Sequence, residues 1–500
     1  MIFSFRKPEP DIVASVDLGS NSFHMIVCRI QNGELIVVDR LREMVRLAAG
    51  IDENKMLTED AQQRALDCLA RMGQRLRDLP HHAVRIVGTN TLRSALNAED
   101  FIEKAEVSLG HPIDIISGVE EARLIYLGVA HSLAANEERR FVMDIGGGST
   151  ELIIGEKFTP VYLESLYMGC VSMSRRFFQD GAISPSAIGK AKIAAEQELE
   201  PFVTRFRKLN WQEAIGASGT IRAVNKIVHA EGWADDGITL KSLKQLVAAL
   251  ESVKHVNELK FSALDPERAP VFPGGVMILY ATFELLGIKK MRVADGALRE
   301  GLIHDLLGRI HHEDVRGKSV ESLAERYHVD KEQAARVQQT AHQLFDQLAN
   351  DWGLDEEHLQ YLEWACQLYE IGLDIAHSNF QKHGAYIIEN ADMAGFSRQE
   401  QKVLATLVLT HRRKIPSKIF KTLSKKWQKH SPYLMIILRL ATLLNRSRMA
   451  ITENIRIAVT KDSIKLDIDA DWLQDHSLTK ADLEVEANYL SSAGFSLQIN

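Results

Sequence analysis

One stretch of the chain combines an acidic residue, a glycine-rich turn and two hydroxyl groups. Phe141–Gly155 reads FVMDIGGGSTELIIG, an apolar strand that ends at Asp144, a turn, and a second strand that opens at Glu151. Glycines allow backbone N–H groups to approach an anion closely. A carboxylate at the end of a strand is suited to hold Mg²⁺, directly or through water. The stretch predicts a phosphate–metal site, and a plain hairpin turn is the alternative.

The same pattern occurs a second time near the amino terminus. Val16–Val27 reads VDLGSNSFHMIV, beside MDIGGGSTELII at Met143–Ile154. An offset of 127 residues pairs Asp17 with Asp144, Gly19 with Gly146, Ser22 with Ser149 and His24 with Glu151. Two copies indicate a duplicated domain. Two such turns facing each other would grip a phosphate chain from both sides, an arrangement that resembles the actin-like, sugar-kinase and chaperone ATPase superfold.

Strand and helix patterns alternate along the first 308 residues, which predicts an α/β fold. Asn32-Gly33 predicts a hairpin turn. Helices are expected after Thr58 and around Arg93, and over Val119–Val129, Pro185–Leu209 and Ala297–Leu307. Apart from the hairpin around Asp144, the expected strands are Ile12–Asp17, Phe23–Ile30, Leu35–Asp39, Val84–Gly88, Ile113–Ser117, Ala214–Ala217 and Arg292–Ala294.

The character of the sequence changes at about His311 and again at about Ile451. Ser319–Ala349, Glu357–Leu373 and Glu400–Leu409 have helical patterns, which predicts an all-helical domain. Alternating apolar residues from Ile455 to Ile468 then predict a hairpin in a small α+β tail that Phe495–Ile499 closes. The predicted domains are 1–125, 126–308, 309–448 and 449–500.

Composition excludes several classes of protein. The 500 residues are 45% hydrophobic and carry a net charge of −7, which argues against a whole surface that binds nucleic acid. The four cysteines have no zinc or CxxC spacing and are expected as buried thiols in a reducing compartment. The amino terminus lacks an apolar signal region, and no apolar run reaches the ~18 residues of a membrane span. A cytoplasmic protein is expected.

Two further turns and a pair of glutamates also follow strand ends. Gly216–Thr220 and Asp295-Gly296 each lead into a helix, so they would present N–H groups and a positive helix end to an anion. Glu120 and Glu121 lie in the first turn of the helix that begins after Ser117-Gly118. A glutamate that faces bound phosphate could orient and deprotonate an attacking water.

Five motifs together resemble the exopolyphosphatase / guanosine-pentaphosphate phosphohydrolase family. They are Asp17–His24, Ser117–Arg123, Asp144–Glu151, Gly216–Thr220 and Asp295–Gly301, and they occur in order. The resemblance covers essentially the whole chain. It implies duplicated actin-like domains of the ASKHA, ribonuclease H-like type, an HD-like helical domain and a small α+β domain. It also implies Mg²⁺ as cofactor, with a monovalent cation as a further option, and a homodimer.

The resemblance implies a role for individual residues. Glu121 matches the catalytic base, Asp144 and Glu151 match the acids that hold Mg²⁺ or the lytic water, and Arg93 matches a phosphate contact. Phosphoryl transfer needs mainly positioning and charge neutralisation, which these residue types supply. The other matching phosphate-side positions are Asp17, Gly19, Asn21, Ser22, Gly146, Gly147, Gly148, Ser149, Ser218, Gly219, Thr220, Asp295, Gly296 and Arg299.

Two activities occur in this family, and the sequence favours the exopolyphosphatase. Three glycines after Asp144 match its long-chain members, whereas pentaphosphate hydrolases often show Gly-Gly-Ala. The run His411–His430 has eight Lys or Arg and no acid, which suits a track for a long polyanion or, alternatively, a solvated basic face. The expected track residues are Arg412, Arg413, Lys414, Lys425 and Lys426.

The favoured hypothesis is therefore Mg²⁺-dependent, processive hydrolysis of the terminal phosphate of inorganic polyphosphate. The alternative is a guanosine pentaphosphate (pppGpp) 5′-phosphohydrolase, or both activities in one protein. An ATP-using kinase or chaperone ATPase of the same superfold fits less well, because no such family shares the Ser117–Arg123 and Asp295–Gly301 motifs. A non-catalytic sensor of polyphosphate or (p)ppGpp fits less well, because the acids Glu121, Asp144 and Glu151 are all present.

The helical domain resembles the metal-dependent HD phosphohydrolases around Leu368–Gly372. The His-Asp pair that defines those enzymes is Tyr369-Glu370 here. Tyrosine is a poor ligand for divalent metals, so this domain is expected to have lost its own catalytic metal. His383 and His411 are then expected to be surface or packing residues.

Overall fold

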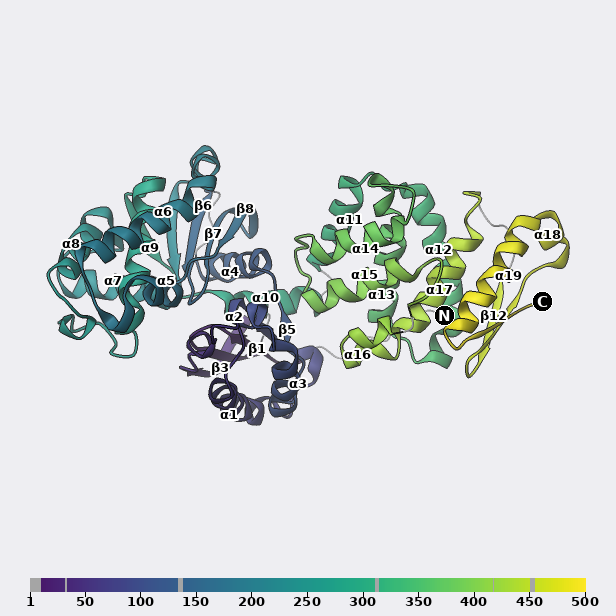
Figure 1. Cartoon of the computed structure of the whole chain (residues 1–500), viewed down its shortest axis with the longest axis horizontal. Helices are drawn as coiled ribbons and strands as arrows, with labels where there is room; N and C mark the ends of the chain where they lie inside the picture. Colours follow the sequence, from purple (N-terminus) through teal and green to yellow (C-terminus); the bar gives the residue numbers. More distant parts are fainter. Residues whose placement is uncertain (1–9, 32–33, 134–137, 311–313, 417, 450–454) are drawn as a thin grey trace. The chain divides into compact units, whose positions relative to one another are not determined.

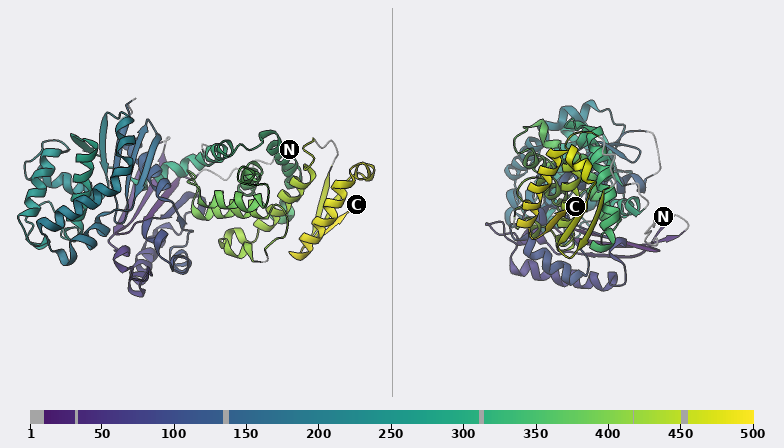
Figure 2. Two further views of the ribbon diagram at one scale, coloured as in Figure 1. Left: turned by 45° about the horizontal axis from the view of Figure 1, so that its top comes forward. Right: turned by 90° about the vertical axis from the view of Figure 1, so that its right-hand side faces the viewer.

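The computed structural model describes residues 10–31, 34–133, 138–310, 314–416, 418–449 and 455–500. The chain divides into two compact units, with the boundary between Glu313 and Asp314. Figures 1 and 2 colour the first unit purple to teal and the second green to yellow. The predicted turn at Asn32-Gly33 lies outside the described residues.

The first unit begins with a five-stranded sheet of order β3-β2-β1-β4-β5. Strands β1, β2 and β3 form an antiparallel meander, and β4 and β5 continue the sheet in parallel with β1. The strands are β1 (Ile12–Leu18), β2 (Phe23–Gln31), β3 (Glu34–Glu43), β4 (Val84–Gly88) and β5 (Asp114–Ile115).

A second sheet of the same unit repeats this topology in the order β10-β11-β9-β6-β7-β8. Strands β6, β7 and β8 form the meander, and β9 and β11 run parallel to β6. Asp17 pairs with His24 in the first meander, and Asp144 pairs with Glu151 in the second. The predicted duplication is confirmed. The strands are β6 (Arg140–Ile145), β7 (Thr150–Glu156), β8 (Thr159–Leu166), β9 (Glu213–Ala217), β10 (Ile238–Thr239) and β11 (Lys290–Val293).

Helices cover both faces of the sheets. One stretch of the described residues, Ala269–Leu286, is apolar and long enough to cross a membrane by composition, yet 67% of it is buried in the unit. It contains α9 and packs against α5 and α6, as a core helix does. The helices of this unit are α1 (Glu59–Leu76), α2 (Asn90–Ser94), α3 (Ala98–Leu109), α4 (Gly118–Ser132), α5 (Cys170–Phe177), α6 (Pro185–Lys208), α7 (Ser218–Ala230), α8 (Leu240–Glu251), α9 (Phe272–Leu286) and α10 (Leu298–Ile310).

Helices α4 and α10 cross at close range, because glycines remove the side chains between them. A Cβ at Gly301 would lie 1.8 Å from the carbonyl oxygen of Leu124, and one at Gly128 would lie 2.0 Å from that of Ala297. Helix α4 packs on β7 and β8 of the second sheet, whereas α10 packs on β1 of the first. The predicted limits at 125 and 308 cut through these two helices, so the chain enters the second subdomain before α4 and returns to the first with α10.

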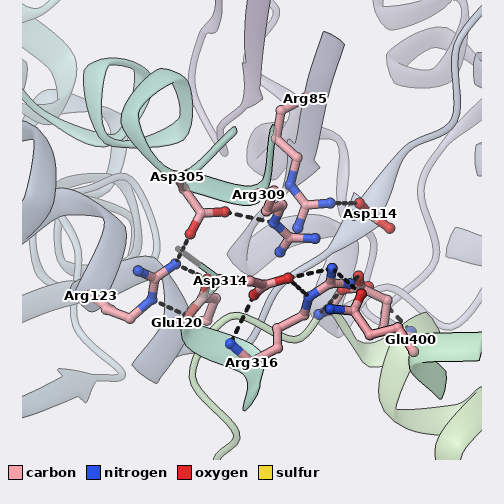
Figure 3. A network of polar contacts seen from close by, with 11 residues as sticks. Arg85, Asp114, Glu120, Arg123, Asp305, Arg309, Asp314, Arg316 and Glu400 are labelled. Atoms are coloured by element: carbon pink, nitrogen blue, oxygen red, sulfur yellow. Dashed lines mark hydrogen bonds and ion pairs between the residues drawn. The ribbon is translucent and has the colours of Figure 1, made fainter. Parts of the chain in front are cut away.

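Ion pairs hold the same two helices together (Figure 3). The guanidinium of Arg123 donates to Glu120 at 2.7 Å and also to Asp305 of α10. Arg309 donates to the second oxygen of Asp305 at 3.0 Å. Arg123 and Asp305 are both buried. Asp314, Arg316 and Glu400, also labelled in Figure 3, form a separate set of ion pairs in the second unit.

The second unit is helical and ends in a three-stranded sheet. The predicted hairpin is present as β12 and β13, and β14 pairs in parallel with β13. This sheet and the helices share one hydrophobic core, so the tail predicted at 449–500 packs as part of the helical domain. The elements are α11 (Val315–Arg326), α12 (Lys331–Trp352), α13 (Glu356–Leu368), α14 (Phe380–Asn390), α15 (Arg398–Thr410), α16 (Lys425–Gln428), α17 (Ser431–Leu444), β12 (Arg456–Thr460), β13 (Ser463–Asp467), α18 (Ala470–Asp475), α19 (Ser477–Ser492) and β14 (Ser496–Ile499).

The structure corrects one predicted helix of this unit. Ser319–Ala349 is expected as one helix, but the chain breaks between α11 and α12. His328 adopts a left-handed backbone with φ of 49°, and the Asp330 side chain caps the next helix by accepting from the Gln333 N–H at 3.0 Å. A residue with positive φ cannot continue a right-handed helix.

Replacing Asp305 with asparagine should destabilise the first unit, because it leaves Arg123 buried with less compensating charge. We expect the free energy of unfolding at pH 7 to fall by about 3 kcal/mol, measured by urea denaturation. The arginines hold the pKa of Asp305 well below its usual range, despite burial. A depressed pKa stabilises above the ordinary aspartate pKa of ~3.9, so the difference should shrink as the pH falls below that value.

Asp482→Asn is the matched control for this prediction. Asp482 pairs with Arg446, whose side chain is 67% exposed, and such surface pairs contribute about 0–1 kcal/mol. Equal losses in the two variants would contradict a special role for the buried network between α4 and α10.

Candidate active site

The alternation of side chains along the strands decides which groups face the α4–α10 crossing. In β6, Phe141 and Met143 belong to the core with α9, whereas Val142 packs on the α4 side. Asp144, two residues after Val142, therefore faces α4. In β1, Ser15 donates a hydrogen bond to the Arg299 carbonyl of α10 at 2.9 Å. Asp17, two residues later, therefore faces α10.

The two glycine turns meet at this crossing, as the duplicated sequence predicts. A Cβ at Gly147 would lie 2.9 Å from the Cβ of Ser20, and one at Gly148 would lie 2.4 Å from Oδ1 of Asn90. Thr91 donates a hydrogen bond to the hydroxyl of Ser20 at 2.8 Å. Both turns therefore pack tightly on their neighbours.

Four carboxylates gather beside these turns: Asp17, Glu121, Asp144 and Glu151. Glu121, Asp144 and Glu151 are buried, with 8%, 7% and 1% of their surface exposed. Burial raises the pKa of all four, and the charge of Glu121 raises that of the other three further. The pKa reaches about 8 for Asp17 and about 7 for Asp144.

Three of these carboxylates have an arginine that opposes the shift. Arg93 lowers the pKa of Glu121, Arg222 that of Asp144, and Arg299 that of Asp17. Among the described residues, the side-chain groups found to lower the pKa of Glu151 are hydroxyls, those of Ser149 and Ser165. Glu151 is therefore the least compensated acid of the cluster.

Helix α4 and two hydrogen bonds fix Glu121. The hydroxyl of Ser117 caps the helix by accepting from the Glu120 N–H at 3.1 Å. Arg93 donates from one nitrogen to the carbonyl of Ile116 at 2.8 Å and to Glu121 at 3.2 Å. Arg93, predicted as a phosphate contact, is thus placed against the predicted base.

Basic side chains surround the opposite part of the site. His24 lies between the hydroxyl of Ser22 at 2.7 Å and the guanidinium of Arg299 at 3.1 Å. Burial, together with the charges of four arginines, lowers the pKa of His24 to about 3, so the ring is neutral. These arginines are Arg299, Arg42, Arg222 and Arg268.

The sequence analysis missed three of these four arginines. Arg42 lies on β3, Arg222 on α7 and Arg268 in a loop, and no motif surrounds them. Burial lowers the pKa of Arg268, and no ion pair is found for it among the described residues. A Cβ at Gly219 would lie 2.3 Å from a guanidinium nitrogen of Arg268. An uncompensated, partly buried guanidinium at a predicted phosphate turn suits an anionic ligand.

The predicted turn Ser218–Thr220 is strained and held in place. Ser218 has a φ of 73°, unusual for a residue with a side chain, and its hydroxyl donates to the Ile145 carbonyl at 3.0 Å. It also hydrogen-bonds to Asp144 and lowers the pKa of that acid. Backbone strain of this kind is typical of functional sites.

Asp295-Gly296 differs from the other predicted turns. A Cβ at Gly296 would lie 2.3 Å from the carbonyl oxygen of Gly128, so the contact with α4 requires the glycine there. Asp295 is exposed. The motif positions α10 and brings Arg299 to Asp17.

Of the remaining predicted residues, Gly19 lies beside Asp17 and Asn21 accepts the Arg46 N–H at 2.8 Å through its carbonyl.

The acids fit a cation that the substrate helps to hold. Within the described ranges, no group of three or more His, Cys, Asp or Glu is arranged to hold a metal alone. Oδ1 of Asp17 and Oε2 of Glu151 are buried and have no hydrogen-bond partner. Mg²⁺ commonly takes only one or two carboxylates and completes its shell with waters and phosphates. Such a cation would satisfy the two orphaned oxygens.

The basic run lies in the second unit and does not form one continuous feature. Arg412 and Arg413 follow α15, whereas Lys425 and Lys426 lie on α16. Lys426 pairs with Glu357 at 2.5 Å, and Lys414 and Lys425 are exposed. His411 is buried, with its ring centroid 5.3 Å from that of Tyr369 and 5.5 Å from that of Phe380. Its surroundings are those of a packing residue.

Known proteins resemble this chain along almost its whole length. Guanosine-5′-triphosphate,3′-diphosphate pyrophosphatases of Aliivibrio fischeri strain MJ11 and Vibrio cholerae serotype O1 are 41% and 40% identical to it, each over 98% of both chains. The crystal structure of an exopolyphosphatase from Cytophaga hutchinsonii matches 60% of this chain and 98% of its own, with a TM-score of 0.54 and 23% identity. That of an Aquifex aeolicus Ppx/GppA family member matches 60% of this chain and 98% of its own, with a TM-score of 0.50 and 25% identity.

Two family descriptions account for both units of the chain. Residues 26–310 match the Ppx/GppA phosphatase family, and residues 315–487 match domain III of the Ppx/GppA phosphatases. The first match begins within β2 and includes the second sheet, the second glycine turn and the acids Glu121, Asp144 and Glu151. The chain belongs to the Ppx/GppA phosphatase family, whose members hydrolyse phosphoanhydride bonds.

Proposed function

We propose that this chain hydrolyses the terminal 5′-phosphoanhydride bond of guanosine 5′-triphosphate 3′-diphosphate. The supporting observation is the 41% identity, over 98% of both chains, with a relative named for that substrate. The candidate active site has the matching chemistry, since carboxylates and arginines lie together beside two glycine turns. This assignment replaces the polyphosphate preference expected from the sequence.

Glu121 is the proposed general base. Burial raises its pKa above the usual value of a glutamate, which makes its carboxylate a stronger proton acceptor. The water oxygen forms a bond to the terminal phosphorus as the bond to the bridging oxygen breaks, and the water proton passes to Glu121. Arg93 holds Glu121 in place, and Arg222, Arg268 and Arg299 neutralise phosphate charge.

Mg²⁺ is the proposed cofactor, held by Asp144 and Glu151 with Asp17 beside them. It supplies positive charge that offsets the phosphate oxygens and the three acids. Asp17 and Glu151 each offer a buried oxygen without a partner, as such an ion requires.

The three-glycine motif does not decide between the two substrates. Gly148 packs on the end of the Asn90 side chain, a local contact that favours a small residue there whatever the length of the substrate. Hydrolysis of inorganic polyphosphate remains the second candidate function. The specific observation in its favour is the pair Arg412 and Arg413, which have no ion-pair partner among the described residues. Homodimerisation stays a prediction.

A comparison of substrates tests the proposal. Phosphate release should be measured side by side from guanosine 5′-triphosphate 3′-diphosphate, long polyphosphate and ATP. We expect kcat/KM to be at least tenfold higher for the guanosine nucleotide than for polyphosphate. A higher value for polyphosphate would restore the exopolyphosphatase hypothesis, and a preference for ATP would contradict both.

Replacing Glu121 with glutamine should remove the base while it keeps the shape of the side chain. Loss of a general base typically lowers the rate by ~10²–10⁴, so kcat should fall by that factor while substrate binding persists. Glu103→Gln, on the exposed face of α3, should have no effect. Near-normal turnover in Glu121→Gln would move the role of base to Glu151.

Replacing Asp144 with asparagine should weaken the binding of Mg²⁺. Saturation at ~100 times the dissociation constant stabilises a folded protein by about 2.7 kcal/mol. In the Glu121→Gln background with saturating nucleotide substrate, Mg²⁺ should therefore raise the unfolding temperature by several degrees. Asp144→Asn should abolish most of that shift, whereas Asp482→Asn should keep it. An equal shift in all three proteins would place the cation elsewhere.

A further inference from the structure

The two copies of the glycine turn differ in one pair of side chains. The offset of 127 residues matches Ser22 with Ser149, and His24 with Glu151. In each copy the serine lies at the end of the turn, and the second residue lies two positions later, on the strand that follows. His24 and Glu151 are the strand partners of the aspartates in their own copies. The same backbone frame thus presents an imidazole in the first copy and a carboxylate in the second.

The second copy uses the proton of its serine within the protein. An ionised carboxylate can only accept hydrogen bonds, so the hydroxyl of Ser149 donates to Glu151. This hydrogen bond lowers the pKa of Glu151, as a bond donated to the charged form does. Ser149 is buried. Its proton therefore serves to hold the acid that faces the proposed cation.

In the first copy the hydrogen bond runs in the opposite direction. A guanidinium nitrogen of Arg299 lies 3.1 Å from Nδ1 of His24. A guanidinium has donors only and is always charged, so Nδ1 accepts and carries no proton. The proton of the neutral ring is then on Nε2, which lies 2.7 Å from the hydroxyl oxygen of Ser22 and donates to it.

The hydroxyl proton of Ser22 consequently points away from His24. No second hydrogen bond of this hydroxyl is found among the described residues. The charged side chains that act most strongly on His24 are all arginines, and arginines cannot accept a hydrogen bond. The hydroxyl is thus a donor without a protein acceptor in a region of positive charge. The acceptor that fits is an anionic oxygen of a ligand.

We propose that His24 is a positioning residue, which turns the hydroxyl proton of Ser22 towards a non-bridging phosphoryl oxygen of the substrate. Arg299 fixes the tautomer of His24 that makes this possible. This role of His24 rests on the proposed hydrolysis of a phosphoanhydride bond in this site. The two copies then have different tasks, since the first orients a donor for the anion and the second orients an acid for the cation.

Calorimetric titration with guanosine 5′-triphosphate 3′-diphosphate and Mg²⁺ tests this role, in a Glu121→Gln background that slows hydrolysis. His24→Leu removes the Nε2 donor, and we expect the dissociation constant to rise about tenfold, as for loss of a hydrogen bond to a charged group. His24→Gln offers an amide oxygen to Arg299 and an amide N–H to Ser22, so its dissociation constant should stay within about twofold of the background value. Equal losses in the two variants would overturn the role.

A double-mutant cycle with Ser22→Ala distinguishes positioning from a structural effect. Ser22→Ala alone should raise the dissociation constant about tenfold or more. Since His24 acts through the Ser22 hydroxyl, adding His24→Leu to Ser22→Ala should change this constant by less than about twofold. A further tenfold loss in the double variant would mean that His24 supports the site independently of Ser22, against the proposal.

His255→Leu is the matched control. His255 has the same tautomer, since its Nδ1 accepts the Asn257 N–H at 3.1 Å and its Nε2 donates to the Asp180 carbonyl at 2.7 Å. It belongs neither to the carboxylate cluster nor to the glycine turns, so its replacement should leave the affinity for the nucleotide unchanged. A loss equal to that in His24→Leu would assign the effect to the stability of the fold and refute the role of His24.

Nitrogen NMR of the His24 ring tests the tautomer without a substitution. In the natural protein at pH 7, the proton should reside on Nε2, in a signal assigned by its loss in His24→Gln. A proton on Nδ1, or on both nitrogens, would overturn the proposal even if the His24→Leu variant failed to fold.

Parallel titrations with long polyphosphate separate this proposal from the proposed substrate. Both ligands end in a phosphoryl group, so the His24 and Ser22 variants should show the same pattern with whichever ligand the natural protein binds and hydrolyses. The pattern with polyphosphate, without binding of the guanosine nucleotide, would refute the proposed function and support the role of His24. Hydrolysis of the nucleotide without the pattern would support the proposed function and refute the role of His24.

Discussion

The mutual repulsion of four clustered carboxylates, three of them buried, is the constraint on which the rest of the first unit depends. Asp17 and Asp144 come from equivalent strands, Glu151 from the next strand, and Glu121 from a helix that crosses between the sheets. Ionising all four carboxyl groups together carries a large electrostatic cost, and burial raises the pKa of each. A cation therefore stabilises such a cluster more than a neutral ligand does. The arginines around His24 then complement the anion that such a cation would accompany.

The crossing of α4 and α10 is what allows this cluster to form. Glycines at 128 and 301 bring the two helix backbones into direct contact, and the Arg123–Asp305 pair ties them together beside Glu121. The alternation in β1 and β6 points Asp17 and Asp144 at these helices. A change at the crossing would therefore move the proposed base relative to the proposed metal ligands. Gly128, Gly301, Arg123 and Asp305 therefore act by positioning the two helices.

Sequence reasoning reached the parts of the site that local patterns encode. The repeat with an offset of 127 fixed the pairing of Asp17 with Asp144, because strand, turn and strand recur in one order. It missed Arg42, Arg222 and Arg268, since a single arginine on a strand, helix or loop has no periodicity that marks its direction. It also misplaced α10, whose return to the first sheet depends on contacts far apart in the sequence. The break at His328 is a single backbone angle, which composition does not reveal.

The difference between local patterns and distant contacts also explains why the sequence indicates the family more clearly than the substrate. In the proposed reaction, the glycine turns and acids contact only the reacting phosphoryl group and its neighbours, which a nucleotide and a polyphosphate chain share. Gly148 packs on the end of the Asn90 side chain, and this contact favours a small residue there whichever substrate is bound. Discrimination must then come from groups that meet the substrate away from the reaction. Two substrates with the same reacting group can thus share one active site. The choice between them then depends on contacts that no sequence motif marks.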